Sequence, residues 1–219
     1  MKRYMIFVEG KADACFIRDY FKFLFGDYII SNDGIKEKEL RNSENIFKIV
    51  VVGGCNKIKN DLKVRIEEIK DFKYNLLVIQ DADSLAKDKK NGGVQQRRIY
   101  LDSIEEELKV NFDTFLFPNN EDDGDLETLL LRIVKEEQFQ KTTDCYKNWT
   151  ECLKNISPIQ FIDELLENKN IVYNYFRTFY GMNKAKEEER VYSEEFWDFS
   201  SKELNPLKVF FENIISKNK

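Results

Sequence analysis

The sequence predicts an α/β fold, in which a parallel sheet of about four strands is flanked by helices and followed by a helical C-terminal extension. Through residues 1–140, short apolar runs alternate with segments of helical periodicity, the pattern of parallel strands joined by helical crossovers. From residue 141 to 219 the strand pattern stops, while helix-start signals continue. We therefore expect an α/β domain at 1–140 and a helical extension at 141–219 that packs on it.

The predicted strands are short apolar runs, each bounded by polar or turn-forming residues. They are Tyr4–Val8, Ile46–Val52, Asn75–Gln80 and Phe112–Phe117. Apolar runs without alternation are typical of strands that are buried on both faces of a sheet. The intervening segments predict helices at Ala12–Phe25, Val94–Leu108 and Asp125–Phe139, and another that begins near Asn56 or Asn60.

Two Pro residues mark helix starts in the C-terminal extension. Ser157-Pro158 and Asn205-Pro206 each place Pro directly after a residue that caps helices well, where the missing N–H of Pro is harmless. These pairs predict helices at Ile159–Glu167 and Leu207–Ile215. Aromatic side chains are frequent in the extension, and we expect most of them to belong to the core.

The composition excludes several classes of function. The chain has no His and a net charge of −5, which excludes Ser-His-Asp and Cys-His catalysis and His-bearing zinc sites. The first apolar run ends at Glu9, too early for a signal peptide or a membrane span. The cysteines lack metal-binding spacing, and Cys145 and Cys152 are predicted as ordinary core residues. We expect a cytoplasmic protein with reduced thiols and no membrane contact.

Acidic residues follow three of the predicted strands. Glu9 ends the first strand, with Asp13 one helical turn further on; Asp81 and Asp83 end the third; and an acidic segment follows the fourth. Ligands of parallel sheets bind at the carboxyl ends of the strands, so we expect these acids to converge on one crevice. Each acid alone is better explained as a solvated strand end or a helix-terminal charge. Together they predict a site for one or two Mg²⁺ or Mn²⁺ ions, which prefer oxygen ligands.

Three segments resemble the Toprim domain, the metal-binding module of topoisomerases, primases and several nucleases. They are VEGKADACF at 8–16, the Gly53-Gly54 pair after the second strand, and IQDADS at 79–84. The resemblance covers about residues 4–135 and implies a Toprim, Rossmann-like fold. Many Toprim proteins carry Gly three residues after the second Asp of this motif, whereas here Asp83 is followed by Ser84-Leu85-Ala86.

The pattern is closer to overcoming-lysogenization-defect (OLD) nucleases and to small stand-alone Toprim proteins of unknown function. The pair Glu9 and Asp13 and the later Gly124-x-Leu126-Glu127 carry this resemblance. It implies that Asp13 and Glu127 bind a second metal ion and that a later Lys, either Lys184 or Lys186, takes part in catalysis. The ATPase domain of those nucleases is missing, because no GxxxxGK[ST] motif occurs, and no ATP site is expected.

The resemblance implies a nuclease that hydrolyses phosphodiester bonds in DNA or RNA with bound Mg²⁺ or Mn²⁺. Glu9 would act as general base or bridging ligand, while Asp81 and Asp83 hold metal. Basic residues just after the third strand are candidates for phosphate contacts, although a solvated loop explains them equally well. They are Lys87, Lys89, Lys90, Arg97 and Arg98. Whether the protein forms a homodimer or acts with a separate protein partner stays open.

Three alternatives use the same residues. A catalytically inactive Toprim-like module would bind nucleic acid without cutting it. A haloacid-dehalogenase-like phosphatase would use Asp81 as nucleophile, but that family carries its DxDx[TV] motif on the first strand, and here Ser84 replaces Thr or Val. A metal-dependent glycosyltransferase would use the Asp81-x-Asp83 motif to hold a nucleotide sugar, which leaves Glu9 and the Gly53-Gly54 pair unexplained.

Overall fold

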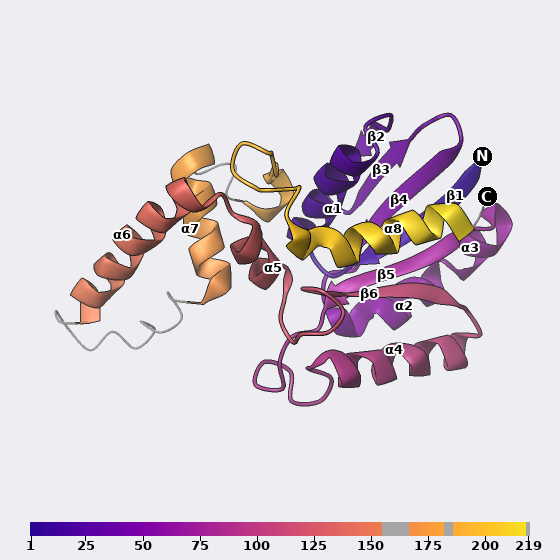
Figure 1. Cartoon of the computed structure of the whole chain (residues 1–219). Helices are drawn as coiled ribbons and strands as arrows, with labels where there is room; N and C mark the ends of the chain where they lie inside the picture. The colour runs from indigo at the N-terminus through magenta and orange to yellow at the C-terminus, as the bar shows by residue number, and fades with distance from the viewer. Residues whose placement is uncertain (155–166, 182–185, 218–219) are drawn as a thin grey trace.

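The computed structural model of the chain describes residues 1–154, 167–181 and 186–217, and it confirms the predicted α/β fold (Figure 1). The sheet has the strand order β2-β3-β4-β1-β5-β6. Its parallel part consists of the four predicted strands, namely β1 (Lys2–Val8), β4 (Asn45–Val51), β5 (Asn75–Asp81) and β6 (Phe112–Phe117). Strand β1 pairs with both β4 and β5, so the strand that Glu9 follows lies in the middle of the sheet.

The sheet has six strands where the sequence predicts about four, because a hairpin extends it beyond β4. The hairpin consists of β2 (Ile29–Asp33) and β3 (Glu37–Arg41), and β3 pairs antiparallel with β4. Every residue of β2 is exposed, and β3 alternates between half-buried and buried positions until it ends at the exposed Arg41. These strands have no apolar run because the hairpin forms the solvent-exposed edge of the sheet.

Helices cover both faces of the sheet, and the residues of β1 alternate between the two cores. Tyr4, Ile6 and Val8 face a core formed with α1 (Lys11–Leu24), α5 (Leu126–Ile133), α7 (Asn168–Tyr180) and α8 (Asn205–Lys217). Met5 and Phe7 face a smaller core formed with α2 (Ile58–Val64), α3 (Ile66–Phe72) and α4 (Val94–Leu108). Figure 1 shows α8 lying across the first of these faces and α4 below the sheet on the other side.

Two predicted helices are each divided in the structure. The helix expected after Asn56 is broken at Arg65 into α2 and α3. The helix expected at Asp125–Phe139 stops at Val134, which is extended and forms a β-bridge with Trp197 before α6 (Glu136–Lys154) begins. Helix α4 has the predicted bounds, and α8 begins at Asn205 as the Asn-Pro pair indicates. The helix predicted at Ile159–Glu167 falls mainly on 155–166, outside the described residues.

The C-terminal extension contributes large aromatic residues to the core on the α1 side of the sheet. Trp197 is fully buried, Phe199 packs edge-on against Phe16 of α1, and Phe211 packs edge-on against Phe21. Helix α6 projects away from the sheet in Figure 1. Its Cys145 and Cys152 are exposed free thiols, so the prediction that they are core residues was wrong. None of the described helices is both long and apolar enough to cross a membrane.

Candidate functional site

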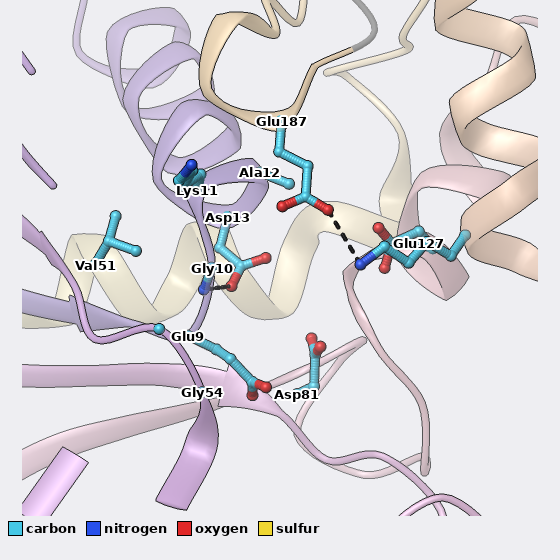
Figure 2. Close-up of a pocket in the computed structure, with 12 residues that line it drawn as sticks. Glu9, Gly10, Lys11, Ala12, Asp13, Val51, Gly54, Asp81, Glu127 and Glu187 are labelled. Atoms are coloured by element: carbon cyan, nitrogen blue, oxygen red, sulfur yellow. Dashed lines mark hydrogen bonds and ion pairs between the residues drawn. The ribbon is translucent and has the colours of Figure 1, made fainter. Parts of the chain in front are cut away.

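A pocket of about 350 Å³ lies at the carboxyl ends of the parallel strands. It is lined by acidic residues from different elements: Glu9 after β1, Asp13 in the first turn of α1, Asp81 at the end of β5 and Glu127 in the first turn of α5. Figure 2 shows the Glu9, Asp13 and Asp81 carboxylates directed toward the same space. Four of the five acids predicted as metal ligands thus line one pocket.

The backbone around Glu9 explains the Gly53-Gly54 pair. The N–H groups of Gly53 and Gly54 both donate to the Glu9 carbonyl oxygen, at 2.9 and 3.2 Å. Gly53 has φ 75° and Gly54 has φ 131°, conformations that residues with a side chain rarely adopt. One residue further on, the Gly10 N–H donates to Asp13 Oδ2 at 2.7 Å, which orients the Asp13 carboxylate at the start of α1.

Asp81 is joined to the start of α5, the helix that carries Glu127. The backbone N–H of Leu126 donates to Asp81 Oδ1 at 2.9 Å. Asp125 caps the same helix by accepting from the Thr128 N–H at 2.9 Å, and the Lys87 ammonium lies 2.5 Å from its other oxygen. Lys87, predicted as a phosphate contact, is therefore engaged in an ion pair beside the pocket.

The acids of the pocket destabilise one another's charged forms. Burial raises the pKa of Asp81 well above its ordinary value of 3.8, and the carboxylates of Asp13 and Glu9 raise it further. Burial likewise raises the pKa of Asp13, whose neighbours include Glu127 and Glu9. The pKa values of Glu9 and Glu127 are also raised, in both cases mainly by burial. A cation in this pocket would relieve the repulsion.

A second feature of Glu9 points to a missing partner. Its Oε2 atom is buried and accepts no hydrogen bond from any described residue. A buried carboxylate oxygen without a partner is costly unless a cation, a water or a substrate group fills the gap. As they stand, however, no three or more acidic or sulfur side chains among the described residues are placed to hold a metal ion. Cation binding therefore requires these side chains to rotate toward a common centre.

Asp83 departs from the sequence-based expectation. It does not line the pocket, and its carboxylate accepts a hydrogen bond at 3.0 Å from Arg97. Burial raises the pKa of Asp83, and the charge of Arg97 opposes that effect. The Arg97 side chain is fully buried, so the expectation that it contacts phosphate on the surface was wrong. The second Asp of the motif is held by α4 outside the pocket lining, although its charge still raises the pKa of Glu9.

The other basic candidates differ in position. Lys89, Lys90 and Arg98 are exposed, and Arg98 donates to the Asn120 carbonyl oxygen at 3.2 Å. Lys186 is also exposed and lines a neighbouring pocket rather than the acidic one. Lys184 lies outside the described residues. Lys89, Lys90 and Arg98 are thus exposed cations on the loop after β5 and on α4.

Sequence reasoning missed Lys169 and Glu187, which also line the acidic pocket. Lys169 lies in the first turn of α7, and its ammonium is 3.1 Å from the Glu187 carboxylate. Arg190, which is almost fully buried, lies 3.9 Å from Glu127. No sequence signal identifies Lys169, because it stands in a polar segment about 90 residues after the DxD motif. The C-terminal extension therefore contributes the ion pair of Lys169 and Glu187 to the lining of the pocket.

The crowding of acids predicts an unusual effect on stability. In a buffer that contains EDTA, Asp81→Asn is expected to raise the thermal midpoint of unfolding, more at pH 8 than at pH 5. Asn keeps an oxygen that accepts the Leu126 N–H but cannot ionise. In wild type, the raised pKa of Asp81 means that the folded state binds more protons than the unfolded state as pH rises above 3.8, so stability falls over that range.

Each unit by which the pKa of Asp81 in the folded state exceeds its pKa in the unfolded state corresponds to about 1.4 kcal/mol of the free energy of unfolding. Thermal unfolding of both proteins, followed by circular dichroism at the two pH values, measures the effect. Asp71→Asn changes an exposed acid on α3, remote from the pocket, and serves as the control. A lower midpoint for Asp81→Asn at pH 8 would show that Asp81 does not suffer the proposed repulsion.

Comparison with known proteins gives a family and a fold. The sequence model of the family described as "Protein of unknown function (DUF3226)" matches residues 3–216. The crystal structure of hypothetical protein PH0156 from Pyrococcus horikoshii OT3 is similar, with a TM-score of 0.54 and 16% sequence identity, over 99% of this chain and 95% of that one. At this identity the similarity shows the fold alone. The search of curated proteins gives no match.

Proposed function

The chain belongs to the DUF3226 family, and we propose that it is a Toprim-like nuclease that hydrolyses phosphodiester bonds in DNA or RNA with Mg²⁺ or Mn²⁺. The observation that carries the proposal is the pocket at the carboxyl edge of the sheet. There, Glu9, Asp13, Asp81 and Glu127 come from three different strand ends. This placement is what the resemblance to OLD nucleases implies for the two sets of metal ligands.

The donor atoms fit a hard divalent cation. The pocket offers carboxylate oxygens without His or Cys, and the unpartnered Glu9 Oε2 is a ready acceptor. Asp81 and Glu9 would hold one ion, and Asp13 and Glu127 a second. Asp83, paired with Arg97, adds its negative charge from outside the pocket. Bound cations of this kind activate water and stabilise the leaving oxygen in phosphodiester hydrolysis.

The chain's own residues supply proton transfer and charge neutralisation. Glu9 accepts the proton of the attacking water, and burial raises its pKa, which makes it a stronger base than an ordinary carboxylate. The Lys169 ammonium, which lines the pocket and pairs with Glu187, contacts the phosphate of the substrate. We therefore place the lysine of the site at Lys169 rather than at Lys186, which lines the neighbouring pocket. Lys89, Lys90 and Arg98 contact phosphates further along the strand.

The thiols agree with a cytoplasmic location, which is part of the proposal. All four cysteines are free, as expected for a protein that stays in a reducing compartment. The net charge of −5 means that nucleic-acid binding depends on the local cations near the pocket rather than on the protein as a whole. The affinity for nucleic acid should therefore fall with added salt, but with a shallow slope, because only a few cations contact phosphates.

The test is a cleavage assay with single- and double-stranded DNA and RNA. We expect the purified protein to cleave at least one of these substrates with Mg²⁺ or Mn²⁺ and to stop when EDTA is added. Either cation should also raise the thermal midpoint of wild type, but not that of Asp81→Asn, because binding to the folded state alone stabilises it.

The alternatives predict different results in the same assay. A phosphatase would hydrolyse a small phosphomonoester and trap BeF₃⁻ on Asp81, with little effect of Glu9→Gln. A glycosyltransferase would hydrolyse or transfer a nucleotide sugar. An inactive module would bind DNA or RNA and cut none with any metal. Each of these outcomes would reject the nuclease proposal.

A further inference from the structure

A second pocket, of about 380 Å³, adjoins the acidic one and shares its Lys169 and Glu187 wall. One side is the first two turns of α7, and the other is the segment that contains Lys186, Glu188 and Arg190. Its volume falls within the range of about 300–1,000 Å³ that is usual for ligand pockets. Both walls belong to the C-terminal extension, whereas the acids of the acidic pocket other than Glu187 come from the α/β domain.

The charge of the adjoining pocket is opposite to that of the acidic one. Its cations are Lys169, Lys186 and Arg190, against the carboxylates of Glu187 and Glu188. Lys169 pairs with Glu187 at 3.1 Å, and Lys11 pairs with Glu188 at 3.4 Å. The carboxylates are thereby neutralised. Lys186 forms no ion pair with any described residue and presents its charge at the pocket rim. The adjoining pocket therefore favours an anionic group. The acidic pocket repels such a group until it holds cations.

Tyr173 gives the adjoining pocket an aromatic wall. It is half-buried, with part of its ring packed against the main core and part lining the pocket. Tyr173 lies four residues after Lys169 on α7, so both side chains are on the same face of the helix. Lys186 lines the same pocket, and a cation and an aromatic ring in one pocket match the phosphate and the base of one nucleotide. Bases stack on aromatic side chains only when they are unpaired.

We propose that the adjoining pocket binds one unpaired nucleotide of the substrate strand, next to the phosphodiester that enters the acidic pocket. Tyr173 stacks on the base, and Lys186 contacts the phosphate. The inference rests on the proposed nuclease function and extends it by naming the substrate class as single-stranded nucleic acid. The shared Lys169 and Glu187 wall then lies between the bound nucleotide and the bond to be cut.

The experiment measures binding of adenosine monophosphate to the full chain in EDTA, by calorimetry or by ligand-observed NMR. Without divalent cations, the acidic pocket repels the phosphate, so the measured binding is that of the adjoining pocket. We expect Tyr173→Ala to weaken binding by about 5- to 150-fold, the usual contribution of base stacking on an aromatic side chain. Tyr173→Phe, which keeps the ring, should bind like wild type. Lys186→Gln should weaken binding and reduce its dependence on salt.

Two controls separate this effect from loss of folding. Trp149→Ala removes an exposed aromatic residue of α6 outside the pocket and should leave binding unchanged. Thermal midpoints check that each variant is folded, and retention of binding by Tyr173→Phe shows that the ring itself matters. A single-stranded oligonucleotide should displace the nucleotide, and a blunt duplex of the same sequence should not.

Three outcomes would overturn the inference: no binding of adenosine monophosphate, equal binding of inorganic phosphate and the nucleotide, or equal displacement by duplex and single strand. Failure of the nuclease proposal has a different signature, because it appears as absent cleavage and absent stabilisation by Mg²⁺. Asp81→Asn should abolish both cleavage and the stabilisation by Mg²⁺, and it should leave nucleotide binding in EDTA intact. The two proposals therefore fail independently.

Discussion

Replacing Asp81 with Asn is expected to abolish Mg²⁺-dependent cleavage while leaving the protein folded. The variant keeps an oxygen for the Leu126 N–H but loses the charge that attracts a cation. Glu9→Gln should reduce turnover by about 10²–10⁴-fold, since an amide has nearly the same shape but cannot accept the proton of the attacking water. Initial rates at saturating substrate and metal measure both effects.

The matched control for these variants is Asp71→Asn, which changes an acid of the same type at the opposite end of β5. It should cleave at the wild-type rate. Residual cleavage in the Asp81→Asn preparation that equals the wild-type rate would indicate a contaminating nuclease or a site elsewhere. Normal turnover by Glu9→Gln would remove Glu9 from the role of general base.

A chain truncated after residue 140 is expected to aggregate rather than fold cooperatively. The lost part includes Trp197, Leu207 and Phe211, all of which are buried in the core that covers the α1 face of the sheet. Their removal exposes the apolar residues of β1, α1 and α5 that they cover. Solubility and thermal unfolding of the 1–140 fragment provide the measurement, and a soluble fragment with a sharp transition would contradict the expectation.

A point substitution tests the same packing in the full chain. Trp197→Ala should cost about 3–5 kcal/mol of the free energy of unfolding, because the residue is fully buried and leaves a large cavity. Trp149→Ala should change it little, since Trp149 is 51% exposed. Chemical denaturation of both variants makes the comparison direct. Similar losses for the two would mean that Trp197 is not a core residue in solution.

The strands that position the site could be predicted from the sequence because they are buried on both faces and hence uniformly apolar. The β2–β3 hairpin could not, because an edge hairpin exposed to water carries Ser31, Asn32 and several charges in place of an apolar run. The interruption of the predicted Asp125–Phe139 helix at Val134 could not be predicted from the sequence either. It depends on a bridge to Trp197, a partner more than sixty residues away.

The same distinction holds within the site. The positions of Glu9, Asp13, Asp81 and Glu127 follow from strand ends and first helical turns, which local sequence fixes. Asp83 could not be placed by such reasoning, because its direction is set by Arg97, a buried side chain on α4. Lys169 and Glu187 reach the pocket only through the packing of the C-terminal extension.

The hydrogen bond from Leu126 to Asp81 has a mechanical consequence. Asp81 terminates a central strand, whereas Leu126 begins the helix that carries Glu127 one residue later. If Asp81 turns toward an incoming ion, the Leu126 N–H loses its acceptor and the first turn of α5 must readjust, which carries Glu127 with it. The two ends of the pocket are therefore linked through the start of one helix, so a rearrangement of Asp81 is expected to change the position of Glu127.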